Sequence, residues 1–207
     1  MTDQPVARSG VIILGASSAI AEAVARRLAG AGARLGLVAR DRARLEAMSA
    51  DLKVRGAAAV AVHAMDLAAP AQTGVLEDLV RDMGGADTVL IAYGLLGDQT
   101  AAETDLQAAQ RVMVVNFTSA TLWALAARQA LEASCGDAGL IVGLGSVAGD
   151  RGRRSNFVYG AAKGGFALAL QGLAHRAALV GGPRAMVIKL GFVDTPMTWG
   201  MKSPLIA

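Results

Sequence analysis

The chain has 207 residues, of which 54% are hydrophobic and 18% charged, and its net charge is +3. These values predict one globular domain over residues 1–207, and a charge this small does not argue for nucleic acid as a partner. Met1–Gly10 contains no apolar core of signal-peptide length, so no signal peptide is expected, and no apolar run is long enough to span a membrane as a helix. The single cysteine, Cys135, points to a reducing compartment. A cytoplasmic location is therefore expected.

Short apolar runs alternate with longer helical patterns along the chain. The runs predict strands at Val11–Leu14, Leu35–Ala39, Ala58–His63, Thr88–Ile91, Leu140–Gly145 and Ala185–Leu190. Helices are predicted over Ala19–Ala29, residues 41–55, Ala71–Met83, Glu103–Glu132 and Asn156–Val180. Strands that are apolar throughout are buried on both faces, and strand–helix repeats give parallel strands. The sequence therefore predicts an α/β protein with a three-layer, doubly wound parallel sheet, the Rossmann fold.

The first predicted strand leads directly into a turn of small residues, Gly15-Ala16-Ser17-Ser18-Ala19-Ile20-Ala21. Gly15 permits a sharp turn, and the small residues let the backbone approach a pyrophosphate at the helix N-terminus, where N–H groups favour anions. Ser17 and Ser18 add hydroxyl donors. Ala19 and Ala21 stand where glycines are commonest, so the turn taken alone also fits an ordinary strand–helix connection.

The second predicted strand ends in Ala39-Arg40-Asp41-Arg42. A cofactor with a free ribose 2′-hydroxyl prefers an acidic residue here, whereas a guanidinium neutralises a 2′-phosphate. Arg40, with Arg42 close by, therefore favours NADP(H) over NAD(H). Asp41 could accept a hydrogen bond from a ribose, but we interpret it as the N-cap of the next helix.

Three polar residues predict a catalytic centre. Ser146 follows the fifth strand, and Tyr159 and Lys163 lie four residues apart, on one face of a helix. A nearby ammonium lowers the pKa of a phenol, which can then protonate a developing alkoxide, while Ser146 holds the carbonyl oxygen and a nicotinamide supplies hydride. A lone Tyr-x-x-x-Lys pair is common on helix surfaces, but here it accompanies Ser146 and a nucleotide-binding turn.

These motifs resemble those of the short-chain dehydrogenase/reductase family over about Val11 to Thr195. The resemblance implies an NAD(P)-dependent oxidoreductase that interconverts a ketone and a secondary alcohol. It assigns catalysis to Ser146, Tyr159 and Lys163, with Asn116 holding a water of the proton relay. It also implies cofactor contacts from Gly15, Ser17, Ser18, Ala19, Ile20, Arg40, Asp66, Leu67, Ala92, Tyr93, Gly94, Tyr159, Lys163, Val193 and Thr195.

The sequence departs from the family pattern at three places. Ala92-Tyr93-Gly94 replaces Asn-Ala-Gly after the fourth strand, and Leu190 replaces a proline before Gly191. Family members usually continue with a substrate-covering helix, another helix and a seventh strand. Because the sequence ends at Ala207, these elements are expected to be missing and the substrate pocket to be open.

Within the family, the segments 91–98 and 148–159 resemble the decaprenylphosphoryl-2-keto-ribose reductases, which reduce a 2-keto-pentose carried on a polyprenyl phosphate. Arg151, Arg153 and Arg154 suit an anionic substrate or membrane surface, but they also fit a solvated loop. The alternatives are a general carbonyl or alcohol reductase and a non-catalytic NADP-binding protein.

The remaining expectations concern metals, packing and partners. His63 and His175 are isolated, so no metal site is predicted. Met186 lies in an apolar run and is predicted to be core. The helices that carry Trp123 and Tyr159 commonly pair between subunits in the family, so a homodimer or homotetramer is expected, although their apolar residues also suit internal packing.

Overall fold

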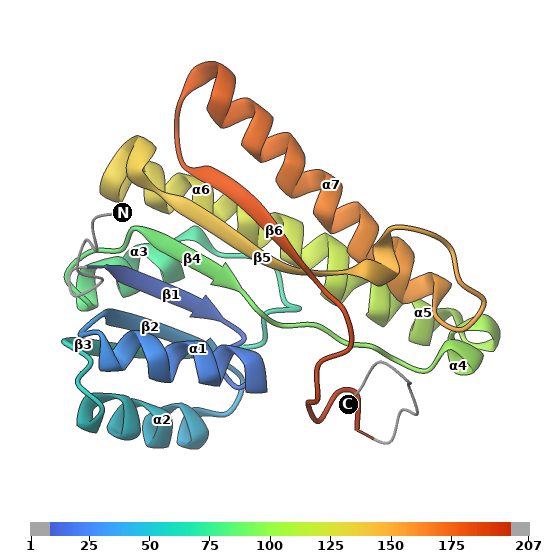
Figure 1. The fold of residues 1–207 in the computed structure, drawn as a ribbon, viewed down its shortest axis with the longest axis horizontal. Coiled ribbons are helices and arrows are strands. Elements are labelled where there is room, and N and C mark those ends of the chain that lie inside the picture. Colours follow the sequence, from blue (N-terminus) through green and yellow to red (C-terminus); the bar gives the residue numbers. More distant parts are fainter. Residues whose placement is uncertain (1–8, 200–207) are drawn as a thin grey trace.

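The computed structural model describes residues 9–199, and its centre is one parallel sheet in the strand order β3-β2-β1-β4-β5-β6 (Figure 1). The strands are β1 (Gly10–Leu14), β2 (Arg34–Ala39), β3 (Ala59–Ala64), β4 (Thr88–Ile91), β5 (Leu140–Ser146) and β6 (Arg184–Leu190). The order reverses between β1 and β4, and ligands of doubly wound sheets bind at such a point, beyond the carboxyl ends of the strands.

Helices cover both faces of the sheet, as predicted for a three-layer Rossmann fold. One face carries α1 (Ala19–Gly30) and α2 (Arg42–Val54), and the other carries α3 (Thr73–Asp82), α6 (Ala120–Cys135) and α7 (Phe157–Val180). Two short helices, α4 (Gln99–Thr104) and α5 (Leu106–Met113), follow β4, and single 3₁₀ turns occur at Gly136–Ala138 and Val147–Gly149.

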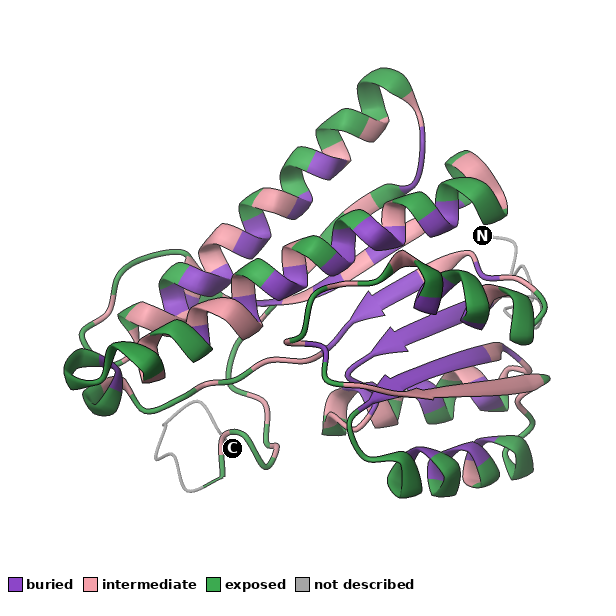
Figure 2. Cartoon of the chain, turned by 180° about the vertical axis from the view of Figure 1, so that it is seen from behind, coloured by how far each residue is buried: buried purple, intermediate pink, exposed green. Residues whose placement is uncertain are grey.

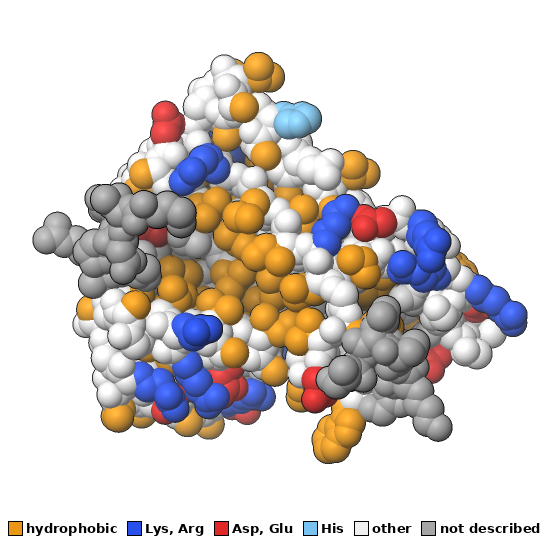
Figure 3. Space-filling view, viewed as in Figure 1, with side chains coloured by type: hydrophobic (Ala, Val, Ile, Leu, Met, Phe, Trp, Pro, Cys, Tyr) orange, Lys and Arg blue, Asp and Glu red, His pale blue; other side chains and the backbone are white. Residues whose placement is uncertain are grey.

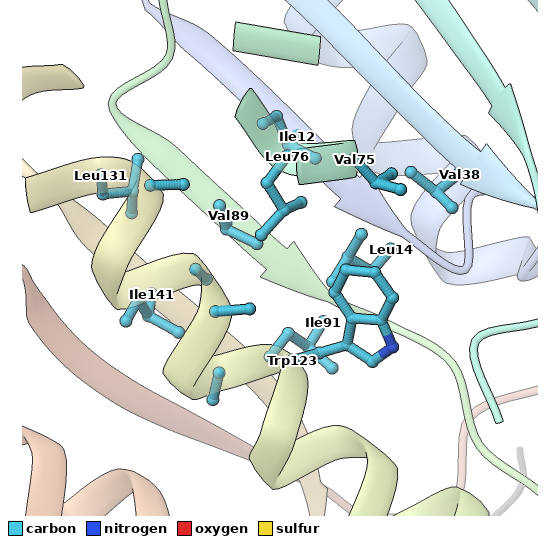
Figure 4. Close-up of a cluster of buried hydrophobic side chains, with 14 of the residues drawn as sticks. Ile12, Leu14, Val38, Val75, Leu76, Val89, Ile91, Trp123, Leu131 and Ile141 are labelled. Atoms are coloured by element: carbon cyan, nitrogen blue, oxygen red, sulfur yellow. The ribbon is translucent and has the colours of Figure 1, made fainter. Parts of the chain in front are cut away.

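The strands at the middle of the sheet are buried because side chains pack on both of their faces (Figure 2). Toward α1, the core is made of small residues such as Ala21, Ala25 and Ala29, so the helix lies close to the sheet. Toward α6, the fully buried Trp123 packs among Leu14 and other aliphatic side chains (Figure 4). Both cores are built mainly from aliphatic residues, as the low aromatic content indicates.

The predicted long helix over Glu103–Glu132 is wrong. The chain adopts an extended conformation at Asp105, with φ −117° and ψ 105°, and this residue ends α4 and begins α5. The Asp105 carboxylate accepts a hydrogen bond from Gln107 N at 2.8 Å, which makes it an N-cap that favours a helix start over a helix interior. A π-helical turn, Val114–Ser119, then separates α5 from α6.

Burial on both faces was predicted for every strand and is wrong for the two edge strands. Every residue of β3 is only half-buried, and β6 is open on one face. Ala185 and Val187 pack against the core that contains Trp123, whereas Met186 and Ile188 point to the opposite face and are 46% and 41% exposed. Figure 3 shows hydrophobic side chains gathered in the middle of this face, over the part of the sheet that α1 and α2 leave open. The predicted core position of Met186 is therefore also wrong.

Candidate active site

A cleft of about 860 Å³ lies at the carboxyl ends of the strands, on both sides of the reversal between β1 and β4. All fifteen of the predicted cofactor-contact residues line it, and so does Ser146. The volume falls in the range of pockets that enclose organic ligands. The turn after β1 and three of the four residues proposed for catalysis, Ser146, Tyr159 and Lys163, thus share one cavity, whereas Asn116 does not line it.

The turn after β1 has the geometry that a close-approaching phosphate requires. Gly15 has φ +87°, and a Cβ placed on it would lie 2.6 Å from Cβ of Tyr93, so no other residue fits there. Ala19 and Ala21 belong to α1 and keep negative φ, so the alanines at these positions carry no strain. Ser18 precedes α1 without capping it through its side chain, which leaves the first-turn N–H groups facing the cleft.

Two arginines that follow β2 line the cleft, and one of them is not the residue that was predicted. Arg40 lines the cleft and is exposed, as expected. Arg42 does not line it and instead pairs with Glu46 at 3.8 Å. Arg44 takes its place, because α2 turns this residue toward α1, where its guanidinium lies 3.3 Å from Glu22. Asp41 caps α2 by accepting from Arg44 N at 3.0 Å, as predicted.

Ser146 and Tyr159 come together although thirteen residues separate them. Ser146 is the last residue of β5, and its Oγ accepts a hydrogen bond from Ala148 N at 3.1 Å, so its hydroxyl hydrogen is left for another acceptor. Tyr159 lies in the first turn of α7. Burial raises the pKa of Tyr159, and a hydrogen bond with Ser146 acts in the opposite direction.

Lys163 lies one turn after Tyr159 and is 5% exposed. Its Nζ donates to the carbonyl oxygen of Leu144 at 2.9 Å, and burial lowers the pKa of Lys163 to about 8. The expected lowering of the Tyr159 pKa by this ammonium is therefore wrong, because burial is the largest effect on the pKa of both groups.

Asn116 lies in the π-helical turn, fully buried and behind the wall of the cleft. Its Oδ1 accepts from Leu95 N at 3.1 Å, and its Nδ2 donates to the carbonyl oxygens of Leu95 and Val112 at 2.6 and 2.8 Å. A Cβ on Gly94 would lie 2.8 Å from Oδ1 of Asn116 and 3.3 Å from Nζ of Lys163. The carboxamide therefore fixes the segment after β4 next to Lys163.

The segment after β6 folds over the other end of the cleft, where Val193 and Thr195 line it as expected. Oγ1 of Thr198 donates to the carbonyl oxygen of Val193 at 2.6 Å and accepts from Thr195 N at 3.2 Å. This turn needs no proline, so Leu190 in the family's proline position is compatible with it.

Sequence reasoning missed several residues of the cleft. Arg44 and Glu22 lie near the predicted ribose site, and Gln110, Arg111, Val114 and Val115 come from α5 and the π-helical turn. A helix predicted without a break gave no way to tell which of its faces meets the cleft. The capping pattern at Asp105 was the available signal, since Asp is among the preferred N-cap residues.

A family model described as short chain dehydrogenase matches residues 9–205. The chain belongs to the short-chain dehydrogenase family. It is 40% identical over 193 residues to an uncharacterized oxidoreductase of Mycobacterium tuberculosis, covering 92% of this chain and 76% of the relative. A bovine 3-oxoacyl-[acyl-carrier-protein] reductase is 29% identical over 194 residues, covering 94% of this chain and 79% of the relative.

Solved structures of the same family share the fold of this oxidoreductase. A short-chain dehydrogenase from Sphingobium yanoikuyae in complex with NADPH superposes with a TM-score of 0.78 at 28% identity, covering 91% of this chain and 73% of the other. An NAD⁺-bound xylitol dehydrogenase superposes with a TM-score of 0.77 at 25% identity, covering 92% of this chain and 73% of the other. The fold thus binds a nicotinamide cofactor, and its relatives use either form. No helix within residues 9–199 is long and apolar enough to cross a membrane.

Proposed function

We propose that the enzyme reduces a ketone to a secondary alcohol with NADPH, and that Tyr159 is the general acid. The observation that carries the proposal is the cleft that Ser146, Tyr159 and Lys163 share with the turn at Gly15. The tight turn at Gly15, which packs too closely on Tyr93 to admit a Cβ, and the N–H groups that begin α1 fit the pyrophosphate of a dinucleotide. When bound, the nicotinamide supplies a hydride to the carbonyl carbon.

The side chains of this protein position the ketone and supply the proton. Ser146 donates its hydroxyl hydrogen to the carbonyl oxygen and positions the ketone. Burial keeps Tyr159 protonated, so its hydroxyl is able to protonate the same oxygen as the alcohol forms. The ammonium of Lys163 stabilises the phenolate that remains, and Asn116 keeps Lys163 in place through the segment at Gly94.

NADPH is proposed over NADH because Arg40 and Arg44 border the cleft at the end of β2. Guanidinium groups suit a phosphate through paired hydrogen bonds. Arg44 lies 3.3 Å from Glu22, so a 2′-phosphate would compete with this carboxylate for it.

For the substrate, we propose a 2-keto-pentose carried on a polyprenyl phosphate. The support is the resemblance of segments 91–98 and 148–159, together with three arginines, Arg151, Arg153 and Arg154, on the loop between Ser146 and Tyr159. Exposed Val147 and Phe157 flank this loop, which suits a lipid that carries a phosphate. A general ketone substrate is the alternative, and the bovine relative makes a β-ketoacyl thioester the first compound to compare.

The test is NADPH oxidation with three substrates: the lipid-linked keto-pentose, the free keto-pentose and a β-ketoacyl thioester. Turnover that requires the lipid phosphate, and that falls in an Arg151→Ala/Arg154→Ala variant only for this substrate, supports the narrower proposal. Turnover of the other ketones alone supports a general reductase. NADPH binding without turnover of any ketone would contradict the proposed activity and favour a nucleotide-binding protein.

We further propose that α6 and α7 pair between two or four copies of the chain. Leu122, Leu125 and Leu168 on these helices are 45%, 41% and 68% exposed. Exposed apolar side chains gathered on two helices are typical of a protein–protein interface. Light scattering of the wild type and of a Leu125→Glu/Leu168→Glu variant tests this, and equal masses for both would contradict it.

A further inference from the structure

A chain of buried hydrogen bonds links the end of β4 to the loop after β3, beside the cleft. Oη of Tyr93 lies 2.6 Å from Oγ of Ser119, and Oγ of Ser119 donates to the carbonyl oxygen of Leu67 at 2.6 Å. Nε1 of Trp123 donates to the same carbonyl oxygen at 3.1 Å. Ser119 and Trp123 are 4% and 0% exposed, so water does not replace these partners.

The direction of the chain is fixed by its donors. Ser119 has one hydroxyl hydrogen, which it gives to Leu67, so Tyr93 must be the donor to Ser119. Burial raises the pKa of Tyr93 above its ordinary value, so this hydroxyl keeps its hydrogen. The carbonyl oxygen of Leu67 thereby accepts two hydrogen bonds from residues at the start of α6.

Both ends of this series of hydrogen bonds lie at the cleft. Asp66, Leu67 and Ala68 line it, and Oδ1 of Asp66 accepts from Ala68 N at 3.0 Å, which closes the loop into a tight turn. Tyr93 also lines the cleft, and its backbone and Cβ lie against Gly15. One side chain therefore contacts the proposed pyrophosphate turn and orients the Asp66–Ala68 loop through its hydroxyl.

We propose that Tyr93, Ser119 and Trp123 are positioning residues that set the Asp66–Ala68 loop for the adenine half of the cofactor. The proposal rests on dinucleotide binding in this cleft. The loop follows β3 and the turn at Gly15 follows β1, and β2 lies between these two strands in the sheet, so no strand pairing joins the loop directly to the turn. The hydrogen bonds to Leu67 supply that connection, and Tyr93 takes part in it where the family has the alanine of Asn-Ala-Gly.

The variants are Tyr93→Phe and Ser119→Ala, and Ser134→Ala is the matched control. Ser134 lies near the other end of the same helix, and its Oγ also donates to a backbone carbonyl oxygen, that of Ala86 at 2.8 Å. The control therefore loses a comparable hydrogen bond far from the cleft. Binding of NADPH, of 2′-phospho-ADP-ribose and of nicotinamide mononucleotide is measured by calorimetry, and stability by chemical denaturation.

We expect the Kd of NADPH and of 2′-phospho-ADP-ribose to rise about threefold in Tyr93→Phe and about tenfold in Ser119→Ala, the range of one or two hydrogen bonds. The KM for NADPH rises more than kcat falls, and nicotinamide mononucleotide binds each variant as it binds the wild type. Ser134→Ala loses stability with no change in any Kd. Tyr93→Phe has no additional effect in the Ser119→Ala background, because both act through one chain.

Unchanged Kd values in both variants, or equal weakening of both cofactor halves, would overturn the positioning role and leave a purely structural one. Failure of the wild type itself to bind NADPH or NADH would instead overturn the proposed cofactor site. The two failures are therefore distinguishable in one set of titrations.

Discussion

The half of the cleft beside β1 and β2 presents backbone amides and exposed side chains, whereas the half beside β5 and β6 presents ionisable groups withdrawn from water. Arg40 in the first half is exposed. In the second half, Lys163 is 5% exposed with a pKa of about 8, and burial raises the pKa of Tyr159. Burying an ionisable group costs free energy, whereas exposing one costs little. Substitutions of exposed side chains in the first half should therefore change binding alone, and substitutions of the buried ionisable groups in the second half should change both rate and stability.

The largest expected effect is that of Tyr159→Phe, which removes the proposed general acid. We expect kcat to fall roughly 10³-fold, within the range for loss of general acid catalysis. The Kd of NADPH should stay within about threefold, because the ring and its packing are retained. Stopped-flow reduction and calorimetric binding check the two parts, and a variant with near-normal turnover would contradict the assignment of Tyr159.

The buried amine of Lys163 predicts a pH-dependent stability. Its pKa is about 8 in the folded protein against 10.5 when exposed, so between these values the unfolded chain binds more protons. The free energy of unfolding should therefore rise with pH in this window, by about 3 kcal/mol in total. Below pH 8, the destabilisation caused by burying the charged amine should be present in full.

Lys163→Met lacks this titration and provides the reference. Urea unfolding of both proteins at pH 7, 8, 9 and 10 gives the difference between them, which should be constant below pH 8 and shift in favour of the wild type above it. Parallel curves over the whole range would show that the amine is not desolvated.

Gly94 lies between the two halves, and a substitution there tests how closely the segment after β4 packs against Asn116 and Lys163. A Cβ at this position would press on Asn116 and Lys163, so Gly94→Ala should cost about 2 kcal/mol of stability, as overpacking does, and lower kcat by displacing Lys163. Gly191→Ala is the matched control, because a Cβ there has no neighbour within 4 Å. Equal thermal denaturation midpoints for the two variants would argue against the close packing at Gly94.

The smallest effect is expected in the exposed half. Arg40→Asp should lower the ratio of kcat/KM for NADPH to that for NADH about tenfold, with no loss of stability. Arg42→Asp is the control, because Arg42 pairs with Glu46 outside the cleft. The same ratio in the wild type and in Arg40→Asp would remove the basis for the NADPH preference.

The first half was largely predictable from the sequence because its residues follow directly from strand ends. Gly15 and Arg40 come immediately after a strand and Asp66 two residues after one, and the order of strands in a doubly wound sheet brings such positions together. The role of Arg44 was not predictable, since the orientation of α2 decides whether Arg42 or Arg44 meets the cleft.

In the second half, the sequence predicted that Ser146, Tyr159 and Lys163 come together, but it did not predict how burial shifts the pKa of Tyr159 and of Lys163. The spacing of Tyr159 and Lys163 places them on one helix face, but only packing shows that Lys163 is buried against Leu144. The break at Asp105 and the π-helical turn were missed for a related reason. Apolar residues lie on both sides of each site, and the interruptions depend on the hydrogen bonds of Asp105 and Asn116.

The π-helical turn at Val114–Ser119 amounts to one residue more than an α-helix needs to make the same advance. Deleting that residue would rotate everything after it by about 100°, since an α-helix has 3.6 residues per turn. Asn116 and the pair Ser119 and Trp123 lie in or just after this turn, and they could not then face Leu95 and Leu67 together. A single-residue gap at this position in an alignment therefore marks a change in the hydrogen bonds beside the cleft, even where the flanking residues are identical.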